Sequence, residues 1–534
     1  MLCSTIENQQ PRKGIMTTSS PPTESTTLSR DTNQALGIGT YAIEFLSDGG
    51  SAAESPDDSV RERTLLFCTD SILCGLSALA LGTNAPTILR NEALEYERPN
   101  GVSVFGSTVP VAPEKAILAN CSAVREWDSN GTNFGYRPEM GHTAGEFGHN
   151  DFYAVPIAAA QLAGRSGADA LMGMILLDEI RGRLAEVFSL KSYKIDHVVH
   201  GAIASAAVYG AMLGATAEQI ESAIGMTVAH FIPWRAIRAG KQLSDSKGAS
   251  AAISTEVAVL SMQRAMRGFQ GPQDIFRNPE AIWRQFETTN GDSPFDLVLS
   301  TGGKDFAVMG MHFKLGLYEH QSAGALQGLI DLLLAHPEIT HDPKAISSIR
   351  IIAYEPAFGI IGDPAKRNPT TRQSADHSMV FIVSRMLQKA IQCSETLATD
   401  SDSLWKQLML MPEDYGDDAL ADQATRALME KIEFEHGGEE YDRRYPDGIP
   451  TSIVIHMNDE SQFESGLIMY PSGHARNATA DLNSILESKF QRLGELCLDD
   501  APSIINRMKS IPTLDAEALR LIWDFNIKEV GGFS

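Results

Sequence analysis

Apolar residues recur at helical spacing through most of the first 300 positions. Residues 216–219 read Thr-Ala-Glu-Gln, which has the form of a capping box at the start of a helix. Small residues crowd the segment 201–214, GAIASAAVYGAMLG, and this composition lets helices approach one another closely. The pattern predicts helices at 35–47, 59–81, 113–124, 150–163, 166–187, 196–213, 217–230, 247–267 and 279–287.

The pattern changes after Gly303, where short β-branched runs alternate with helical stretches. Strands are predicted at 305–314 and 346–354, with a helix at 319–334 between them. Residues 452–457 and 462–470 flank a polar turn and predict a hairpin. A helix at 377–393 and a polar loop region at 412–450 complete this part. The last segments, 479–494 and 514–526, are predicted to be helical again.

The order of these elements predicts a mainly α fold with an α+β second domain. We expect a large helical domain over 35–304 and a smaller α/β lid domain over 305–476. The helices of 477–534 return to the helical domain, which is therefore split in sequence. Residues 1–34 are rich in Ser, Thr and Pro and are predicted to form a disordered tail.

Composition narrows the function classes. The chain of 534 residues carries 68 acidic and 44 basic side chains, and this excess argues against a nucleic-acid partner. Its most apolar stretch, 198–213, is too short for a membrane span, so no membrane partner is expected. The six cysteines form no CxxC pair and are interpreted as reduced, mostly buried thiols. The N-terminal tail mixes acids with bases, which leaves the cytoplasm and the mitochondrial matrix both open.

The segment 235–252 concentrates positive charge on this acidic chain. It holds Arg235, Arg238, Lys241 and Lys247 against one acid, Asp245. A cationic patch on an anionic background favours a pocket for a small polyanion. Lys247 falls where a loop enters an alanine-rich helix, and the positive end of the helix dipole there favours its neutral amine. We expect this lysine to move protons near neutral pH.

A second group of polar residues lies in the Gly-rich segment 125–156. Loops that hold Asp and His side chains on a helical scaffold often form active sites, although a well hydrogen-bonded structural loop fits the composition equally well. His142 and His149 are seven residues apart, which is no standard metal-ligand spacing, and no metal is predicted. The polar residues of this segment are Asp128, Asn130, Thr132, His142, Glu146, His149 and Asp151.

Further candidates are isolated side chains. His197 and His200 share a helix face after Asp196, and one of them is a credible proton carrier, although a satisfied core histidine is the commoner case. Ser244 and Lys247 spell an SxxK pair, but the other motifs of acyl-transfer enzymes are missing. Four more side chains are each interpreted as structural when taken alone: Lys314, His320, His377 and His474.

Taken together, several segments resemble the MmgE/PrpD family. The resemblance runs in order from about residue 41 to residue 476, which is most of the chain. The segments that carry it read DSNGT with the GH…HND loop after it, DHVVHGAIASAA, WRAIRAGKQLSDSKGASAA, GPQDIFRNPEA, HFKLGLYEHQSAGAL, RNPTTRQSADHS and YPSGHAR.

The resemblance implies a split helical domain with a smaller α/β lid, a homodimer, and dehydration of 2-methylcitrate or a related 2-alkylcitrate without a cofactor. By position, Asp128 and Thr132 match the family's DxxxT element. The family's loop histidine falls on His149 or on His142, because the loop is longer here than in bacterial members. The remaining positions for proton transfer and anion binding fall on His197, Lys247 and Lys314.

The expected chemistry fits these residue types. Arg235, Arg238, Lys247 and Lys314 are expected to bind three carboxylates, with Thr132 and His320 also contacting the substrate. A histidine or Lys247 is expected to take the proton, and a second histidine, oriented by Asp128, to protonate the leaving hydroxyl. The alternatives are a dehydratase for longer alkylcitrates, a cis-aconitate decarboxylase, an inactive helical binding protein and an acyl-transfer enzyme using Ser244.

Overall fold

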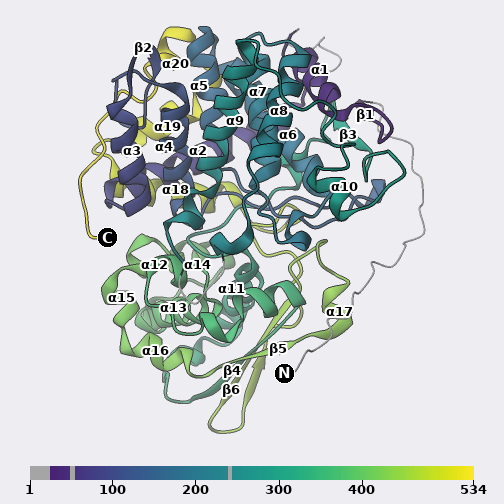
Figure 1. The fold of residues 1–534 in the computed structure, drawn as a ribbon. Helices are drawn as coiled ribbons and strands as arrows, with labels where there is room; N and C mark the ends of the chain where they lie inside the picture. The colour runs from purple at the N-terminus through teal and green to yellow at the C-terminus, as the bar shows by residue number, and fades with distance from the viewer. Residues whose placement is uncertain (1–23, 48–54, 239–242, 534) are drawn as a thin grey trace, which may run out of the picture.

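A helical part forms the upper half of the molecule in Figure 1. The computed structural model describes residues 24–47, 55–238 and 243–533. Two short strands, β1 (Ser25–Leu28) and β3 (Leu297–Ser300), pair antiparallel at its edge. Its helices are α1 (Gln34–Ser47), α2 (Asp58–Ala80), α3 (Asn84–Glu95), α4 (Pro113–Glu126), α5 (Ala154–Ala163), α6 (Gly167–Val187), α7 (Val198–Met212), α8 (Ala217–His230), α9 (Asp245–Met266) and α10 (Ile282–Phe286).

Helix α7 lies at the centre of this part and is buried on every side. It packs against α9, α6, α8 and α5. Its small residues make these close approaches feasible: a Cβ atom on Gly201 would lie only 2.1 Å from the ring of Phe152. The capping box predicted at Thr216 is present, with reciprocal hydrogen bonds between Thr216 and Gln219 at the start of α8.

The lower half of the molecule combines a four-stranded sheet with short helices (Figure 1). The strand order is β5-β4-β6-β7, with β4 parallel to β5 and antiparallel to β6. Helix α11 packs on β6. The elements are α11 (Ala323–Ala335), β4 (Ile346–Ala353), α12 (Arg372–Ala375), α13 (Met379–Gln392), α14 (Ser401–Leu408), α15 (Asp417–Ala421), α16 (Gln423–Met429), β5 (Ile432–His436), α17 (Gly438–Asp442), β6 (Thr451–Met457) and β7 (Gln462–Glu464).

The chain then returns to the helical part, where its last helices appear in yellow in the upper half of Figure 1. These helices are α18 (Leu482–Cys497), α19 (Ala501–Lys509) and α20 (Ala516–Arg520). Helices α18 and α19 pack against α2, and α20 packs against α5. The predicted mainly α fold with an α+β part is confirmed.

Three local predictions are wrong. Residues 305–314 form no strand; a 3-10 turn, Ala307–Gly310, is followed by isolated bridge pairing of His312 with Thr132. The region 412–450 is not one loop, because it contains α15, α16, α17 and strand β5. Residues Ser25–Leu28, placed in the disordered tail, pair with β3 instead. Short elements like these are fixed by the partner strand or helix they contact, which local sequence does not reveal.

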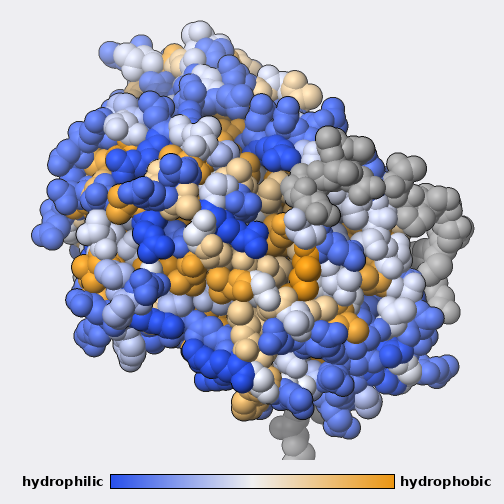
Figure 2. Space-filling view, turned by 90° about the horizontal axis from the view of Figure 1, so that it is seen from above, coloured by the Kyte–Doolittle hydropathy of each residue, from blue (hydrophilic) through white to orange (hydrophobic). Residues whose placement is uncertain are grey.

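The surface and the cysteines add little that is unusual. Apolar residues are interspersed among hydrophilic ones on the face shown in Figure 2. Among the residues that the structure describes, α2 is the helix long and apolar enough to cross a membrane, and 78% of its most apolar window is buried in the protein. The five described cysteines are free thiols, and all except Cys393 are buried.

Candidate active site

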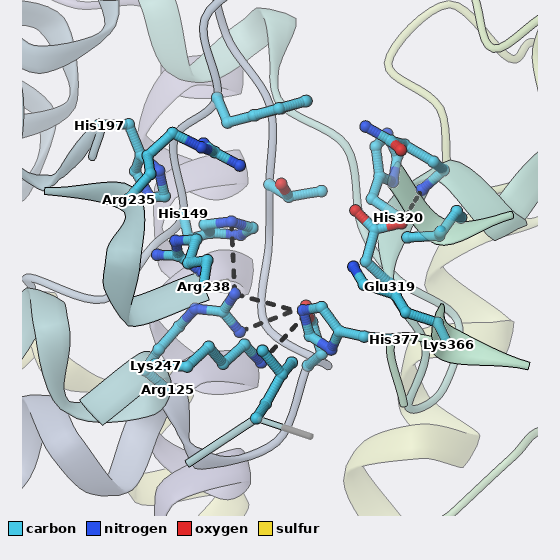
Figure 3. Close-up of a pocket in the computed structure, with 16 residues that line it drawn as sticks. Arg125, His149, His197, Arg235, Arg238, Lys247, Glu319, His320, Lys366 and His377 are labelled. Atoms are coloured by element: carbon cyan, nitrogen blue, oxygen red, sulfur yellow. Dashed lines mark hydrogen bonds and ion pairs between the residues drawn. The ribbon is translucent and has the colours of Figure 1, made fainter. Parts of the chain in front are cut away.

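A polar cavity lies where the helical part meets the α/β part, with about 630 Å³ of empty space including its mouth. Figure 3 shows its lining, with Glu319, His320, Lys366 and His377 facing side chains from the helical part. The residues that line it are Arg125, Asp128, Thr132, Phe147, His149, His197, Arg235, Arg238, Leu243, Lys247, Glu319, His320, Gln321, Ile361, Lys366 and His377.

Most of the residues singled out from the sequence meet here. Lys314 lies immediately behind the cavity wall, where its ammonium contacts Asp128. His142 lies elsewhere, with Nδ1 3.8 Å from Glu186 Oε2, so the cavity geometry favours His149 over His142. Lys241 falls outside the described residues. The cavity lining includes the predicted residues Asp128, Thr132, His149, His197, Arg235, Arg238, Lys247 and His320.

Asp128 is the centre of the charge arrangement. It follows the end of α4 and is 1% exposed. Its Oδ1 lies 3.2 Å from Arg125 Nη1, and its Oδ2 lies 3.5 Å from Lys247 Nζ and 2.8 Å from His377 Nε2, while Lys314 also contacts it. Burial raises the pKa of Asp128, but these neighbouring groups outweigh burial and hold the pKa well below its usual range. The carboxylate therefore stays ionised and binds the surrounding cations in place.

Lys247 occupies the first turn of α9, as the sequence predicted, and its side chain is 2% exposed. Burial and the charges of Arg125 and Arg238 lower the pKa of Lys247 to about 8, against the opposing effect of Asp376 and Asp128. A tenth or so of the amine is then neutral at pH 7, which suits a group that accepts a proton. Ser244 is exposed outside the cavity, which leaves the SxxK interpretation without a nucleophile at the site.

The lowered pKa of Lys247 can be measured directly. Cyanate carbamoylates neutral amines, so the rate of Lys247 modification is expected to reach half its maximum at about pH 8 instead of near 10.5. Peptide mass spectrometry over a pH series gives this rate, and the exposed Lys304 in the same digest reports a solvent-facing amine. Modification of Lys247 that follows the same pH dependence as Lys304 would contradict the assignment.

Two histidines on the helical side of the cavity lie close together. The ring centroids of His149 and His197 are 5.2 Å apart, and His149 Nε2 lies 3.4 Å from Arg125 Nη2. Burial, chiefly, lowers the pKa of both histidines well below the usual value, so both rings are uncharged at neutral pH. His197 Nδ1 is 3.4 Å from Asp196, whose carboxylate also pairs with Arg238.

The histidine that contacts Asp128 is His377, which was interpreted from sequence as structural. Its Nε2 faces Asp128 and its Nδ1 lies 2.5 Å from Asp376 Oδ1. The sequence left open which histidine Asp128 orients, and in the structure the histidine in contact with it is His377. His377 was present in the segment RNPTTRQSADHS that carried the family resemblance, and this was the available signal. Arg125, Glu319 and Lys366 were also missed, because each is an ordinary charged residue without a local motif.

A lysine from the C-terminal helix α18 holds the segments that carry Asp128 and Lys314. The Lys489 ammonium is completely buried and donates to the carbonyl oxygens of Ser129 at 2.7 Å and Lys314 at 2.9 Å. It also pairs with Asp70 Oδ1 on α2 at 2.7 Å. This one side chain thereby fixes the backbone on both sides of the Asp128–Lys314 contact.

Among the described residues, no group of three or more His, Cys, Asp or Glu side chains is arranged to hold a metal ion. The lining residues together form a cationic cavity with an amine of lowered pKa and three uncharged histidines, His149, His197 and His320.

Comparisons with known proteins identify the family. The chain matches the MmgE/PrpD N-terminal domain over residues 50–293 and the MmgE/PrpD C-terminal domain over residues 406–510. A 2-methylcitrate dehydratase of Escherichia coli (strain K12) is 26% identical over 446 residues, which cover 80% of this chain and 85% of that protein. A mitochondrial 2-methylcitrate dehydratase of Yarrowia lipolytica is 27% identical, covering 82% and 80%. An alkylcitrate dehydratase of a fungal species (strain ATCC 74256) is 24% identical, covering 87% and 89%.

The dehydratase relatives define the class: the protein is an enzyme, a carbon–oxygen lyase. The chain belongs to the MmgE/PrpD family.

Proposed function

We propose that the protein dehydrates 2-methylcitrate, or a 2-alkylcitrate close to it, to the 2-alkyl-cis-aconitate by general acid–base catalysis without a cofactor. The observation that carries this proposal is the convergence of cations and uncharged histidines on one buried cavity. The relatives named 2-methylcitrate dehydratase and alkylcitrate dehydratase support the same substrate class.

The cations serve the charge of the substrate. A citrate carries three carboxylates, and removing a proton next to a carboxylate adds further negative charge in the transition state. Arg235 and Arg238, on the 3-10 turn Arg235–Arg238, and Lys366, from the opposite wall, line the cavity as donors for these carboxylates. Preorganised charges in a buried site stabilise such a transition state by about 3 kcal/mol for each well-aimed donor.

Lys247 is the proposed base. Its neutral amine takes the proton from the carbon that bears the alkyl group, the electron pair forms the C=C bond, and the bond to the neighbouring tertiary hydroxyl breaks. The ammonium that forms lies 3.5 Å from the Asp128 carboxylate, which stabilises it. His149 and His197 are uncharged, and each ring carries one N–H that can donate a hydrogen bond to a substrate carboxylate or hydroxyl oxygen.

The alkyl group requires an apolar surface. Phe147, Leu243 and Ile361 supply one among the otherwise polar lining, and Leu243 and Ile361 are buried. Each methylene placed on such a surface contributes roughly 0.8 kcal/mol to binding. The same surface makes a longer 2-alkylcitrate the second candidate substrate, in line with the alkylcitrate dehydratase relative.

Turnover of purified protein tests the proposal. With 2-methylcitrate we expect formation of a conjugated alkene, followed by ultraviolet absorbance and confirmed by mass spectrometry as loss of one water. A series of citrates with alkyl chains of increasing length then ranks the two candidates by kcat/KM. Release of carbon dioxide from cis-aconitate without any dehydration of 2-alkylcitrates would contradict the proposal and favour the decarboxylase.

Three further expectations accompany this proposal. The homodimer is tested by light scattering of the purified protein. The compartment, cytoplasm or mitochondrial matrix, is tested by fractionation; the Yarrowia lipolytica relative is named mitochondrial. We also propose that 305–476 acts as the lid domain over a helical domain made of 35–304 and 477–534, which limited proteolysis with and without substrate tests.

A further inference from the structure

The proposed dehydration needs an acid for the departing hydroxyl, and the cavity offers two carboxyl groups among its described lining residues, Asp128 and Glu319. Asp128 is committed to its ion pairs with Arg125, Lys247, Lys314 and His377. Giving up a proton requires a group that holds one at the start of the reaction. The environment of Asp128 keeps it ionised, which removes it as a donor.

The histidines are also poorly placed for this step. Both ring nitrogens of His377 face carboxylates, Asp128 at 2.8 Å and Asp376 at 2.5 Å. His320 Nε2 lies 2.9 Å from His312 Nδ1. His149 Nε2 faces the Arg125 guanidinium, which only donates, so this nitrogen acts as an acceptor and the single proton of the uncharged ring lies on Nδ1, where it is too weakly acidic for this step. His197 lies on the helical side, beside the arginines proposed to bind the substrate carboxylates.

Glu319 has the position that the acid needs. It precedes the 3-10 turn His320–Ser322, and its Oε2 accepts a hydrogen bond from the backbone N–H of Gln321 at 2.8 Å. Its own backbone N–H donates to the carbonyl of Asp376 at 2.8 Å, which fixes the main chain. The side chain is half-buried and lines the cavity, and Figure 3 shows it across from Arg235 and Arg238. A carboxyl group is thus presented from the α/β side toward the space where the substrate is expected.

The surroundings of Glu319 favour its protonated form. Burial, followed by the negative charge of Asp128, raises the pKa of Glu319 against the opposing effect of His377 and Lys314. A carboxylate would also repel a triply charged substrate in this confined space, whereas a carboxylic acid can donate a hydrogen bond to it.

We propose that Glu319 is the catalytic acid of this site, an assignment that rests on the proposed dehydratase function. As Lys247 removes the carbon-bound proton, the C–O bond breaks and the departing oxygen takes the proton of Glu319, leaving as water. Glu319 is then a carboxylate and Lys247 an ammonium. Transfer of one proton from Lys247 to Glu319 through that water restores both groups, so no other reactant is consumed.

Glu319→Gln with two substrates tests this role. Glutamine keeps the size of the side chain and an oxygen for the Gln321 N–H, but it has no acidic proton. With the proposed 2-alkylcitrate we expect kcat to fall by about 10²–10⁴-fold while KM changes little. Replacing the substrate hydroxyl by fluorine provides a leaving group that departs as fluoride with far less need for an acid. On this analogue the variant is expected to stay within about threefold of the unmodified enzyme, measured with a fluoride electrode.

The outcomes distinguish failure of the role proposed for Glu319 from failure of the proposed dehydratase function. Near-normal kcat of Glu319→Gln on the hydroxyl substrate, or an equal loss on both substrates, would overturn the role of Glu319 while leaving the dehydratase function intact. An unmodified enzyme that turns over neither compound would overturn the proposed function and this inference with it. Glu338→Gln on the surface is the matched control and should leave both rates unchanged. Circular dichroism of Glu319→Gln verifies the fold, and Glu319→Asp, which keeps the acid, should retain more activity on the hydroxyl substrate than Glu319→Gln.

Discussion

Lys247→Arg and Lys247→Met are both expected to lower kcat on the proposed substrate by about 10²–10⁴-fold. The reason is the same for both: neither side chain offers a neutral amine at neutral pH. Arginine keeps the positive charge but does not deprotonate in proteins. The two variants therefore distinguish proton transfer from anion binding, because arginine would partly replace lysine in binding an anion.

The measurement is kcat and KM of both variants at saturating and limiting substrate, with Lys304→Met on the surface as the control. Full activity of Lys247→Met would remove Lys247 from the site assignment altogether. Activity of Lys247→Arg close to that of the unmodified enzyme would assign Lys247 to charge alone and return the base to His149 or His197.

Lys489→Met is expected to cost about 3–5 kcal/mol of stability, because it leaves the Asp70 carboxylate buried without its partner. The side chains of Lys489 and Asp70 are both fully buried, 2.7 Å apart. It also removes the donor shared by the Ser129 and Lys314 carbonyl oxygens. Urea unfolding followed by circular dichroism measures the change.

The double variant Asp70→Asn, Lys489→Met removes both charges and separates stability from positioning. We expect it to unfold at a higher urea concentration than Lys489→Met alone, since no unpaired charge is left buried. Its kcat should nevertheless stay reduced, because the backbone beside Asp128 and Lys314 has lost its shared donor. Lys509→Met, which breaks an exposed pair with Glu487, is the matched control and should change stability by less than about 1 kcal/mol. A double variant with normal kcat would contradict the positioning role.

The long helices were predictable because their signals are local. Thr216 and Gln219 form the predicted capping box, and most of the small-residue segment 201–214 lies in the fully buried helix α7. The segment 305–314 was not predictable in the same way. Its apolar residues, such as Phe306 and Phe313, are buried, but they lie on an irregular backbone that passes beside Thr132. An apolar run predicts burial, but the backbone conformation of that run depends on the distant segment that it contacts.

The residues of the site also differ in whether the sequence alone could identify them. Lys247, Arg235 and Arg238 were found because they are neighbours in the sequence and stand out against an acidic chain. His377 and Lys489 come from segments more than 100 residues away from Lys247, and no local pattern connects them with Asp128. His142 and His149 occur in the same loop, and only the folded structure distinguishes them, because His149 lines the cavity and His142 does not.

Lys489 comes much later in the sequence than its partner Asp70, and this order has a consequence for biosynthesis. Chains emerge from the ribosome N-terminus first, and domains generally fold as they appear. Helices α2 and α4 are complete long before α18 leaves the ribosome, so Asp70 must wait as an unpaired carboxyl group inside a nascent helical assembly. We therefore expect turnover to require that α18 has emerged and packed against α2, and we expect nascent chains that lack α18 to be preferred clients of chaperones.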